Sequence, residues 1–240
     1  MNEQITTQTT APKLGRKWIY IIAGSLIGLL VVAAVVGAWY VYVYQGWNPN
    51  QIEYRDPKFT DSEKQILNDR LKAAEQALEK ASNDNDKYKA TMAIGIEHFS
   101  LGEFVQARDY YLQASKILPD NATAWAELYV VEYEMANYIR ANRAIDKAIS
   151  VNDASPRYWL SKIKVQKEKL EASDSVIAEL YKKAIEKSKS ADIHTSYAQY
   201  LESKNDIVGA VAQWKLAAEK APDNAALYQA EITRIQNQLK

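Results

Sequence analysis

Residues 107–121 read ARDYYLQASKILPDN, and residues 210–224 read AVAQWKLAAEKAPDN. Both stretches have alanine at their first and eighth positions, an aromatic residue at the fifth, and Pro-Asp-Asn at the end. Between them, alanine recurs at positions 141, 148 and 184. The series 114, 148, 184 and 217 advances by 34, 36 and 33 residues. This spacing identifies a sequence repeat of about 34 residues.

A repeat of this length, with proline and glycine at its joints, is typical of a helix–turn–helix unit. The alanines allow helices to approach closely, and the aromatic residues fill the space between neighbouring pairs. One pair cannot bury both of its faces, so stacking of successive pairs must supply the core. Only 8 glycines and 6 prolines occur in 240 residues, as suits a mostly helical chain with short connections. We therefore expect an all-α fold, an α-solenoid.

The pattern resembles that of the tetratricopeptide repeat (TPR) family. In the first clear copy the matching residues are Ile94, Gly95, Gly102, Phe104, Ala107, Tyr111, Ala114 and Pro119. The resemblance implies a repeat domain over residues 61–240 with about four helix pairs, at 88–121, 122–155, 156–190 and 191–224. The third copy departs from the pattern, because its middle carries about two extra residues and Ile177 stands where a small residue is usual.

Capping helices are expected at both ends of the stack. Residues 60–63 read Thr-Asp-Ser-Glu, which is a capping box, and apolar residues follow at helical spacing. This pattern predicts a helix at 61–82. A last helix is predicted at 225–239, where Tyr228, Ile232 and Ile235 recur at a similar spacing.

The N-terminal part predicts a single membrane span. Residues 18–44 contain no charged side chain, and about 20 apolar residues suffice to cross a bilayer as a helix. Trp18 and Trp39 place aromatic rings toward the two ends, as membrane interfaces favour. We predict a transmembrane helix at 18–44 and a short linker at 45–60.

The flanking charges predict the orientation of this helix. Lys13, Arg16 and Lys17 lie in the tail 1–17, and the positive-inside rule keeps such a tail in the cytoplasm. The repeats are then expected on the extracytoplasmic face of the cytoplasmic membrane. The alternative is a cleaved signal peptide ending near residues 36–38. The apolar stretch is longer than a signal peptide needs, so we favour an uncleaved anchor.

Gly24 and Gly28 form a GxxxG motif inside the predicted span. This spacing lets two helix backbones approach closely and is one candidate helix-packing site for a homo-oligomer. Glycine is also common in membrane helices without such a role, and we favour that interpretation.

The composition argues against several classes of function. Lys plus Arg and Asp plus Glu each number 30, so no overall basic field attracts nucleic acid. No cysteine is present, which excludes thiolate catalysis and disulfides. The two histidines, His98 and His194, lack a second histidine at metal-ligand spacing. Neither a phosphate-binding glycine loop nor a GxSxG motif occurs. We expect no enzyme activity, cofactor or metal.

The resemblance implies that the first helix of each pair lines a concave groove that binds other proteins. The residues that it places there are Met92, Ile96, Phe99, Ala126, Val130, Tyr133, Arg157, Leu160, Lys164, Lys167 and Gln199. Met92 and Ile96 stand where chaperone-binding members carry Lys and Asn, which argues against that kind of ligand.

Within this groove the first three residues have two interpretations. Met92, Ile96 and Phe99 could seat an apolar segment of a partner, or they could receive apolar residues of the preceding helix 61–82. We favour the second interpretation. The middle of the groove, from Tyr133 to Lys167, is then the better candidate for an open site.

A basic stretch lies in the third repeat, where Lys162, Lys164, Lys167 and Lys169 occur within eight residues. Their spacing spreads them over more than one helix face, so a solvated surface is the simpler interpretation. A patch for an acidic partner or a lipid headgroup is the alternative. The sequence as a whole predicts a membrane-tethered scaffold for protein–protein interaction. A structural subunit of a self-assembling complex is the second hypothesis.

Overall fold

The computed structural model describes residues 28–40, 46 and 48–237. The chain divides into two compact units, Met1–Trp47 and Asn48–Lys240. In the first unit, residues 28–40 are helical. Across the described residues, no helix is both long enough and apolar enough to cross a membrane. The other residues of the predicted span, 18–27 and 41–44, lie outside the described part of the chain.

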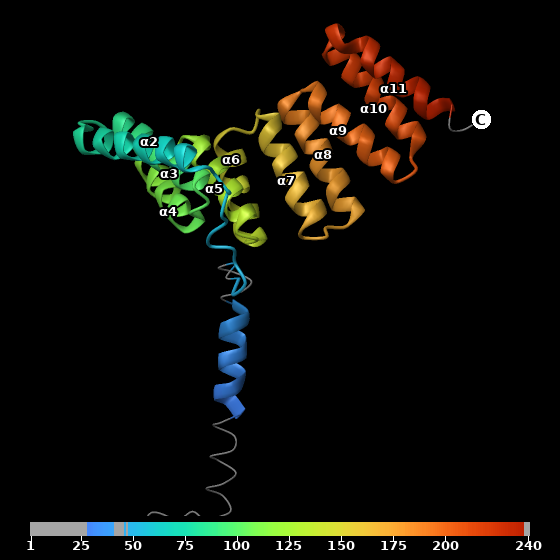
Figure 1. Ribbon diagram of the computed structural model, residues 1–240. Helices are drawn as coiled ribbons and strands as arrows, with labels where there is room; N and C mark the ends of the chain where they lie inside the picture. Colours follow the sequence, from blue (N-terminus) through green and yellow to red (C-terminus); the bar gives the residue numbers. More distant parts are fainter. Residues whose placement is uncertain (1–27, 41–45, 47, 238–240) are drawn as a thin grey trace, which may run out of the picture. The chain divides into compact units, whose positions relative to one another are not determined.

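The second unit is an all-α, TPR-like solenoid in which consecutive helices pack as pairs (Figure 1). The helices are α2 (Asp61–Lys80), α3 (Asp84–Ser100), α4 (Phe104–Ile117), α5 (Ala122–Glu134), α6 (Tyr138–Val151), α7 (Pro156–Glu168), α8 (Asp174–Ser188), α9 (Ala191–Ser203), α10 (Ile207–Lys220) and α11 (Ala225–Asn237), with a 3₁₀ turn η1 (Pro222–Asn224) before α11. The pairs are α3/α4, α5/α6, α7/α8 and α9/α10, and α2 and α11 pack at the two ends.

Side chains at the helix starts account for several of these boundaries. The capping box before α2 is confirmed, because Glu63 N–H donates to Thr60 Oγ1 and Thr60 N–H donates to Glu63 Oε2 at 2.8 Å. Asn83 accepts from the backbone N–H of Asp86 at 2.9 Å and caps α3. α7 begins with Pro156, whose missing N–H needs no partner at a helix start.

The turns inside three of the pairs each contain a residue with a positive φ angle. Gly102, Ala136 and Asn205 have φ values of +78°, +61° and +61°, and each lies in the turn between the two helices of its pair. Glycine adopts this left-handed conformation without strain, whereas alanine does not. The turn at Ala136 therefore carries strain that the turn at Gly102 avoids.

Small residues bring the helices of a pair together. The recurring alanines at positions 107, 114, 141, 148, 184, 210 and 217 have no exposed surface. Gly95 of α3 lies against the ring of Tyr111 in α4, and a Cβ atom added there would meet Tyr111 Cε1 at 2.7 Å. The short helix separation thus depends on the absence of side-chain atoms at these positions.

The third pair is built differently. Ile177 of α8 takes the place of the alanine found in the other second helices and is buried, with 1% of its surface exposed. A larger side chain at this position separates the helices, and α7 and α8 pack less closely than the other pairs. The longer connection between them contains Glu171, which has a φ of +50°. The irregularity in the sequence therefore corresponds to a wider helix pair.

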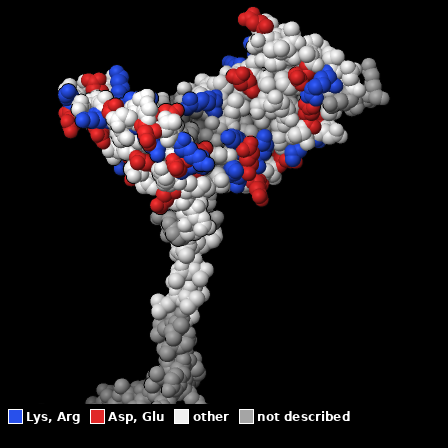
Figure 2. Space-filling model, in the orientation of Figure 1, with Lys and Arg blue, Asp and Glu red and all other residues white. Residues whose placement is uncertain are grey.

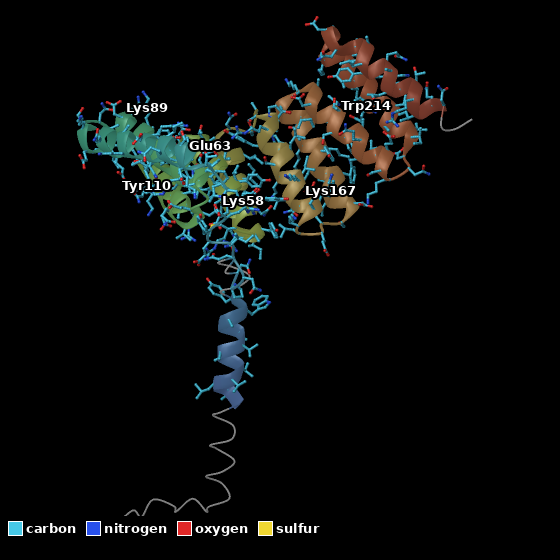
Figure 3. The ribbon with its side chains drawn as sticks, viewed as in Figure 1. Lys58, Glu63, Lys89, Tyr110, Lys167 and Trp214 are labelled. Carbon is cyan, nitrogen blue, oxygen red and sulfur yellow. The ribbon has the colours of Figure 1, made fainter. Side chains whose placement is uncertain are left out.

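The end helices pack through few residues. α2 contributes the buried Ala74, and its Arg70 forms an ion pair of 2.7 Å with Glu97, a buried carboxylate of α3. Ile66 of α2 and Ile96 of α3 both remain exposed. Helix α2 therefore does not cover Ile96, one of the three groove residues that were expected to receive it. At the other end, α11 buries Ile232 and Ile235. Its Tyr228 packs on Trp214, which is labelled in Figure 3, with ring centroids 5.9 Å apart.

Residues 48–57, which we name the strap, begin with a turn at 49–50 and then cross the turns of the first two pairs without forming a helix. Ile52 N–H donates to Met135 O at 3.0 Å, Arg55 N–H to Gly102 O at 3.0 Å, and Phe104 N–H to Glu53 O at 3.1 Å. Tyr54 and Glu103 form an isolated antiparallel β-bridge. Most of the segment predicted as a linker is thus fastened to the repeat unit by backbone hydrogen bonds.

Candidate protein-binding groove

A hollow of about 280 Å³ lies between α5 and α7, in the middle of the groove that the sequence predicted. It is lined by Ala126, Glu127, Tyr129, Val130, Ile145, Arg157, Tyr158 and Ser161. Polar atoms make up more of its exposed wall than apolar atoms, because a guanidinium, a carboxylate and hydroxyl groups stand beside the apolar and aromatic side chains. Such a mixture of polar and apolar groups can contact both the backbone and the side chains of a peptide segment.

The periodicity of the two helices places these residues in rows. Ala126, Val130 and Tyr133 follow one another along α5 at helical spacing, and Arg157, Ser161 and Lys164 do so along α7. The amine of Lys164 lies 4.8 Å from the centroid of the Tyr133 ring. This cation–π contact continues the groove past the hollow toward the C-terminal ends of both helices.

Three tyrosines line this end of the groove. The ring centroids of Tyr129 and Tyr133 are 5.8 Å apart, and those of Tyr133 and Tyr138 are 5.4 Å apart. The amine of Lys169 stands 5.1 Å from the Tyr138 ring. The rings form one continuous aromatic surface with lysines against it. Ligand side chains, apolar or aromatic, can pack on such a surface.

The tyrosine hydroxyls of the groove stay protonated at neutral pH. Loss of solvent raises the pKa of Tyr129 to about 12 and that of Tyr133 to about 12, and the nearby Glu168 carboxylate adds to both shifts. The Tyr133 hydroxyl donates a hydrogen bond to Glu168 Oε2 at 3.3 Å. The tyrosines therefore offer hydrogen-bond donors and apolar faces without adding negative charge.

The lysines of the third repeat separate into two groups. Lys162 forms an ion pair of 2.7 Å with Asp146 and donates to Asn142 Oδ1 at 2.8 Å, and only 12% of its side chain is exposed. It fastens α7 to α6. Lys164, Lys167 and Lys169 are exposed, and Figure 3 marks Lys167 near the C-terminal end of α7. Figure 2 shows Lys and Arg side chains around the position of α7, mixed with acidic residues.

The other predicted groove residues have varied surroundings. Met92 and Ala126 are buried in the core cluster of the first two pairs, and Phe99 packs against this cluster. Leu160 packs against the cluster formed by α7, α8 and α9. Ile96 and Gln199 are exposed on α3 and α9. Of the predicted residues, the structure brings Ala126, Val130 and Arg157 together around one hollow.

The predicted packing site in the N-terminal helix is described only at one residue. Gly28 has open space where a side chain would stand, and Gly24 lies outside the described residues. The GxxxG interpretation stays a prediction.

Further hollows lie on the described part of the repeat unit. One, of about 480 Å³, lies between α2 and α3 and is lined mainly by alanines, with Lys80, Asp86 and Lys89 beside them. Another, of about 330 Å³, lies beside the strap and is lined by Arg55, Phe99, Phe104 and Glu134 among others. Arg55 forms an ion pair of 2.6 Å with Glu134 there, so its cation is already engaged.

Sequence reasoning missed several residues of the hollow. Glu127, Tyr158 and Ser161 were not assigned to the groove, although each lies one residue or a helical turn from an assigned one. The signal was present in the helical spacing, because Ser161 follows Arg157 by four residues. The strap offered no such signal, since an extended segment with mixed polar residues resembles any linker.

The fold defines a class, the TPR-like helical solenoids, and solved structures share it. A crystal structure of MamA has a TM-score of 0.53 and 19% identity, covering 72% of this chain and 99% of that one. A second, of MamA protein, has 0.52 and 19%, covering 69% and 88%. TTC0263, a thermophilic TPR protein in Thermus thermophilus, has 0.48 and 18%, covering 71% and 90%. The two likenesses to MamA show the fold alone.

The remaining comparisons give no match. No family model matches the chain, and a search of curated proteins finds no significant relative.

Proposed function

We propose that this chain is a scaffold for protein–protein interaction, tethered to the cytoplasmic membrane by residues 18–44 with its repeats on the extracytoplasmic side. The observation that carries the binding role is the hollow between α5 and α7, open to solvent and bordered by apolar, aromatic and cationic side chains. The uncharged stretch 18–44 and the basic residues before it support the tether and its direction.

A groove of this kind holds a partner whose side chains insert into it, and it does not convert a substrate chemically. Val130 and Tyr129 offer an apolar seat, and Arg157 and Ser161 offer polar contacts at its border. Extended or helical segments of other proteins bind helix-lined grooves through such alternating contacts. The chain would thus hold a partner protein at the membrane surface.

Site-specific photo-crosslinking in intact cells tests the binding role. The photoreactive residue p-benzoylphenylalanine replaces Thr123, exposed at the start of α5, or Lys147, exposed on α6, as the matched control. We expect crosslinks to other proteins from position 123 and few from position 147, identified by mass spectrometry. Crosslinks from both positions that join only copies of this chain would instead support the structural-subunit hypothesis and refute the scaffold.

Protease protection tests the tether separately. A protease added outside the cytoplasmic membrane, after removal of any outer barrier, should digest the repeat unit and leave the N-terminal tail intact. Digestion of the repeats only after the membrane is opened would show that the orientation is reversed.

A further inference from the structure

The two walls of the groove between α5 and α7 differ in chemistry. The α5 wall offers Ala126, Val130 and the Tyr133 ring, which carry no charge at neutral pH, and one carboxylate, Glu127. The α7 wall offers the cations Arg157 and Lys164. A ligand that fits both walls must place apolar groups on one side and anionic groups on the other.

The cations of the α7 wall are exposed to solvent, and Arg157 is already paired with a carboxylate of α5. Arg157 has one carboxylate partner, Glu127, at 3.4 Å, and this arginine is exposed. Among the described residues, no carboxylate lies within ion-pair distance of Lys164, Lys167 or Lys169. The amines of Lys164 and Lys169 lie over the faces of tyrosine rings. Such contacts leave ammonium hydrogens free to donate to an acidic group.

The local charge balance differs from that of the chain. Arg157, Lys164, Lys167 and Lys169 carry four positive charges along the groove, against two negative charges from Glu127 and Glu168. Over the whole chain the charges cancel. At the hollow itself Arg157 and Glu127 balance, so the excess of two positive charges lies beyond it, toward the C-terminal end of α7.

The spacing of the cations fixes the spacing of the anions. Arg157 and Lys164 are seven residues, or two turns, apart on one helix, which is about 10 Å at 1.5 Å per residue. An extended segment in the polyproline II conformation advances about 3.1 Å per residue and makes one turn every three residues. Two carboxylates three residues apart therefore lie on the same side of such a segment, about 9 Å apart. A side chain between them can then enter the hollow beside Val130.

We propose that the groove between α5 and α7 binds an extended segment of a partner protein in which acidic residues three positions apart flank an apolar residue. This proposal rests on the proposed function and names the chemistry of its partner. The carboxylates bind Arg157 and Lys164, and the apolar residue fills the hollow lined by Tyr129, Val130 and Tyr158.

Fluorescence anisotropy with the full chain in detergent tests this proposal. The probe is a short labelled peptide with two glutamates three residues apart on either side of a leucine. Matched peptides carry glutamine or lysine in place of both glutamates. We expect the glutamate peptide to bind at least tenfold more tightly than the glutamine peptide. Its affinity should fall as ionic strength rises from about 0.01 M to about 0.15 M, over which the screening length shrinks from about 30 Å to about 8 Å.

Variants locate the site. The double substitution Arg157→Glu with Lys164→Glu should weaken the glutamate peptide at least tenfold and improve binding of the lysine peptide. The matched control, Lys182→Glu with Lys183→Glu, reverses two exposed lysines of α8 and should leave both affinities unchanged. If the charge-reversed groove variant loses helical content, the double substitution Arg157→Gln with Lys164→Gln is used instead. We expect it to weaken binding of the glutamate peptide by a smaller factor.

The outcomes separate this proposal from the scaffold itself. Equal binding of the glutamate and glutamine peptides, or full affinity in the groove variants, overturns the acidic preference. Crosslinks from position 123 to other proteins would still uphold the scaffold in that case. Failure of every peptide to bind, together with no such crosslinks, would remove both.

Discussion

Replacing Gly102 by alanine should release the strap from the turn between α3 and α4. Gly102 has a φ of +78°, and a Cβ atom added to it would overlap the carbonyl oxygen of Arg55. The strap must therefore move away from the turn. When the strap moves, two backbone hydrogen bonds are lost: one from Arg55 N–H to Gly102 O and one from Phe104 N–H to Glu53 O.

The magnitude follows from these losses. Alanine in the left-handed region costs about 1 kcal/mol relative to glycine. Each backbone hydrogen bond contributes about 1 kcal/mol net. The free energy of unfolding of the N-terminal repeats should fall by about 3 kcal/mol in the Gly102→Ala variant.

Urea unfolding of the full chain in detergent, followed by far-UV circular dichroism, measures this change. Hydrogen exchange with mass spectrometry should show faster exchange in the peptide that contains Arg55. The matched control is Ala136→Gly, which places glycine at a φ of +61° and should stabilise by about 0.5 kcal/mol. A Gly102→Ala variant with unchanged stability and unchanged exchange in the strap would refute the docked arrangement.

Three further perturbations have expected outcomes. Ile177→Ala should destabilise the third pair by about 3 kcal/mol, because it opens a cavity between helices that isoleucine holds apart. Arg70→Ala should destabilise α2 by about 1–2 kcal/mol, because it leaves the buried carboxylate of Glu97 without its cation. Burial raises the pKa of Glu132 above its usual value of 4.5, so the folded state holds this proton more tightly than the unfolded chain. The contribution of Glu132 to stability is therefore greatest below pH 4.5 and is lost as pH rises through its folded pKa. The Glu132→Gln variant should not lose this stability as the pH rises.

Denaturant unfolding measures the stability change in each of these three variants. For each variant, one result would contradict the prediction. An Ile177→Ala variant as stable as the parent would show that the third pair can close around the smaller residue. Arg70→Ala should leave the C-terminal helices unaffected, so a uniform loss across the chain would contradict its local role. For Glu132→Gln, a stability difference from the parent that does not grow between about pH 4 and about pH 7 would contradict the buried carboxylate.

Much of the repeat fold followed from side-chain size and spacing. Ala107 and Ala141 are 34 residues apart, and Ala210 follows 69 residues, or about two repeats, later. Each must fit against a neighbouring helix, and packing of this kind leaves a periodic pattern in the sequence. The capping box at Thr60 was equally readable, since its residues bond to one another across three positions. Local interactions of this kind need no knowledge of distant parts of the chain.

Contacts between distant residues could not be read in this way. The strap pairs Ile52 with Met135, across 83 residues, through backbone atoms that every residue type possesses. The lysines of α7 looked equivalent in sequence, yet Lys162 is fixed by Asp146 while Lys164 faces Tyr133. Which lysines are available depends on the rotation of α7 about its axis, and that is set by tertiary packing.

The central claim is that a partner protein lies in the groove between α5 and α7. Hydrogen exchange with mass spectrometry on the full chain, alone and with the partner captured by crosslinking from position 123, tests it most directly. Protection should increase in peptides from α5 and α7 and stay unchanged in α8 and α10. Protection confined to α8, α10 or α11, with none in α5 and α7, would contradict the account.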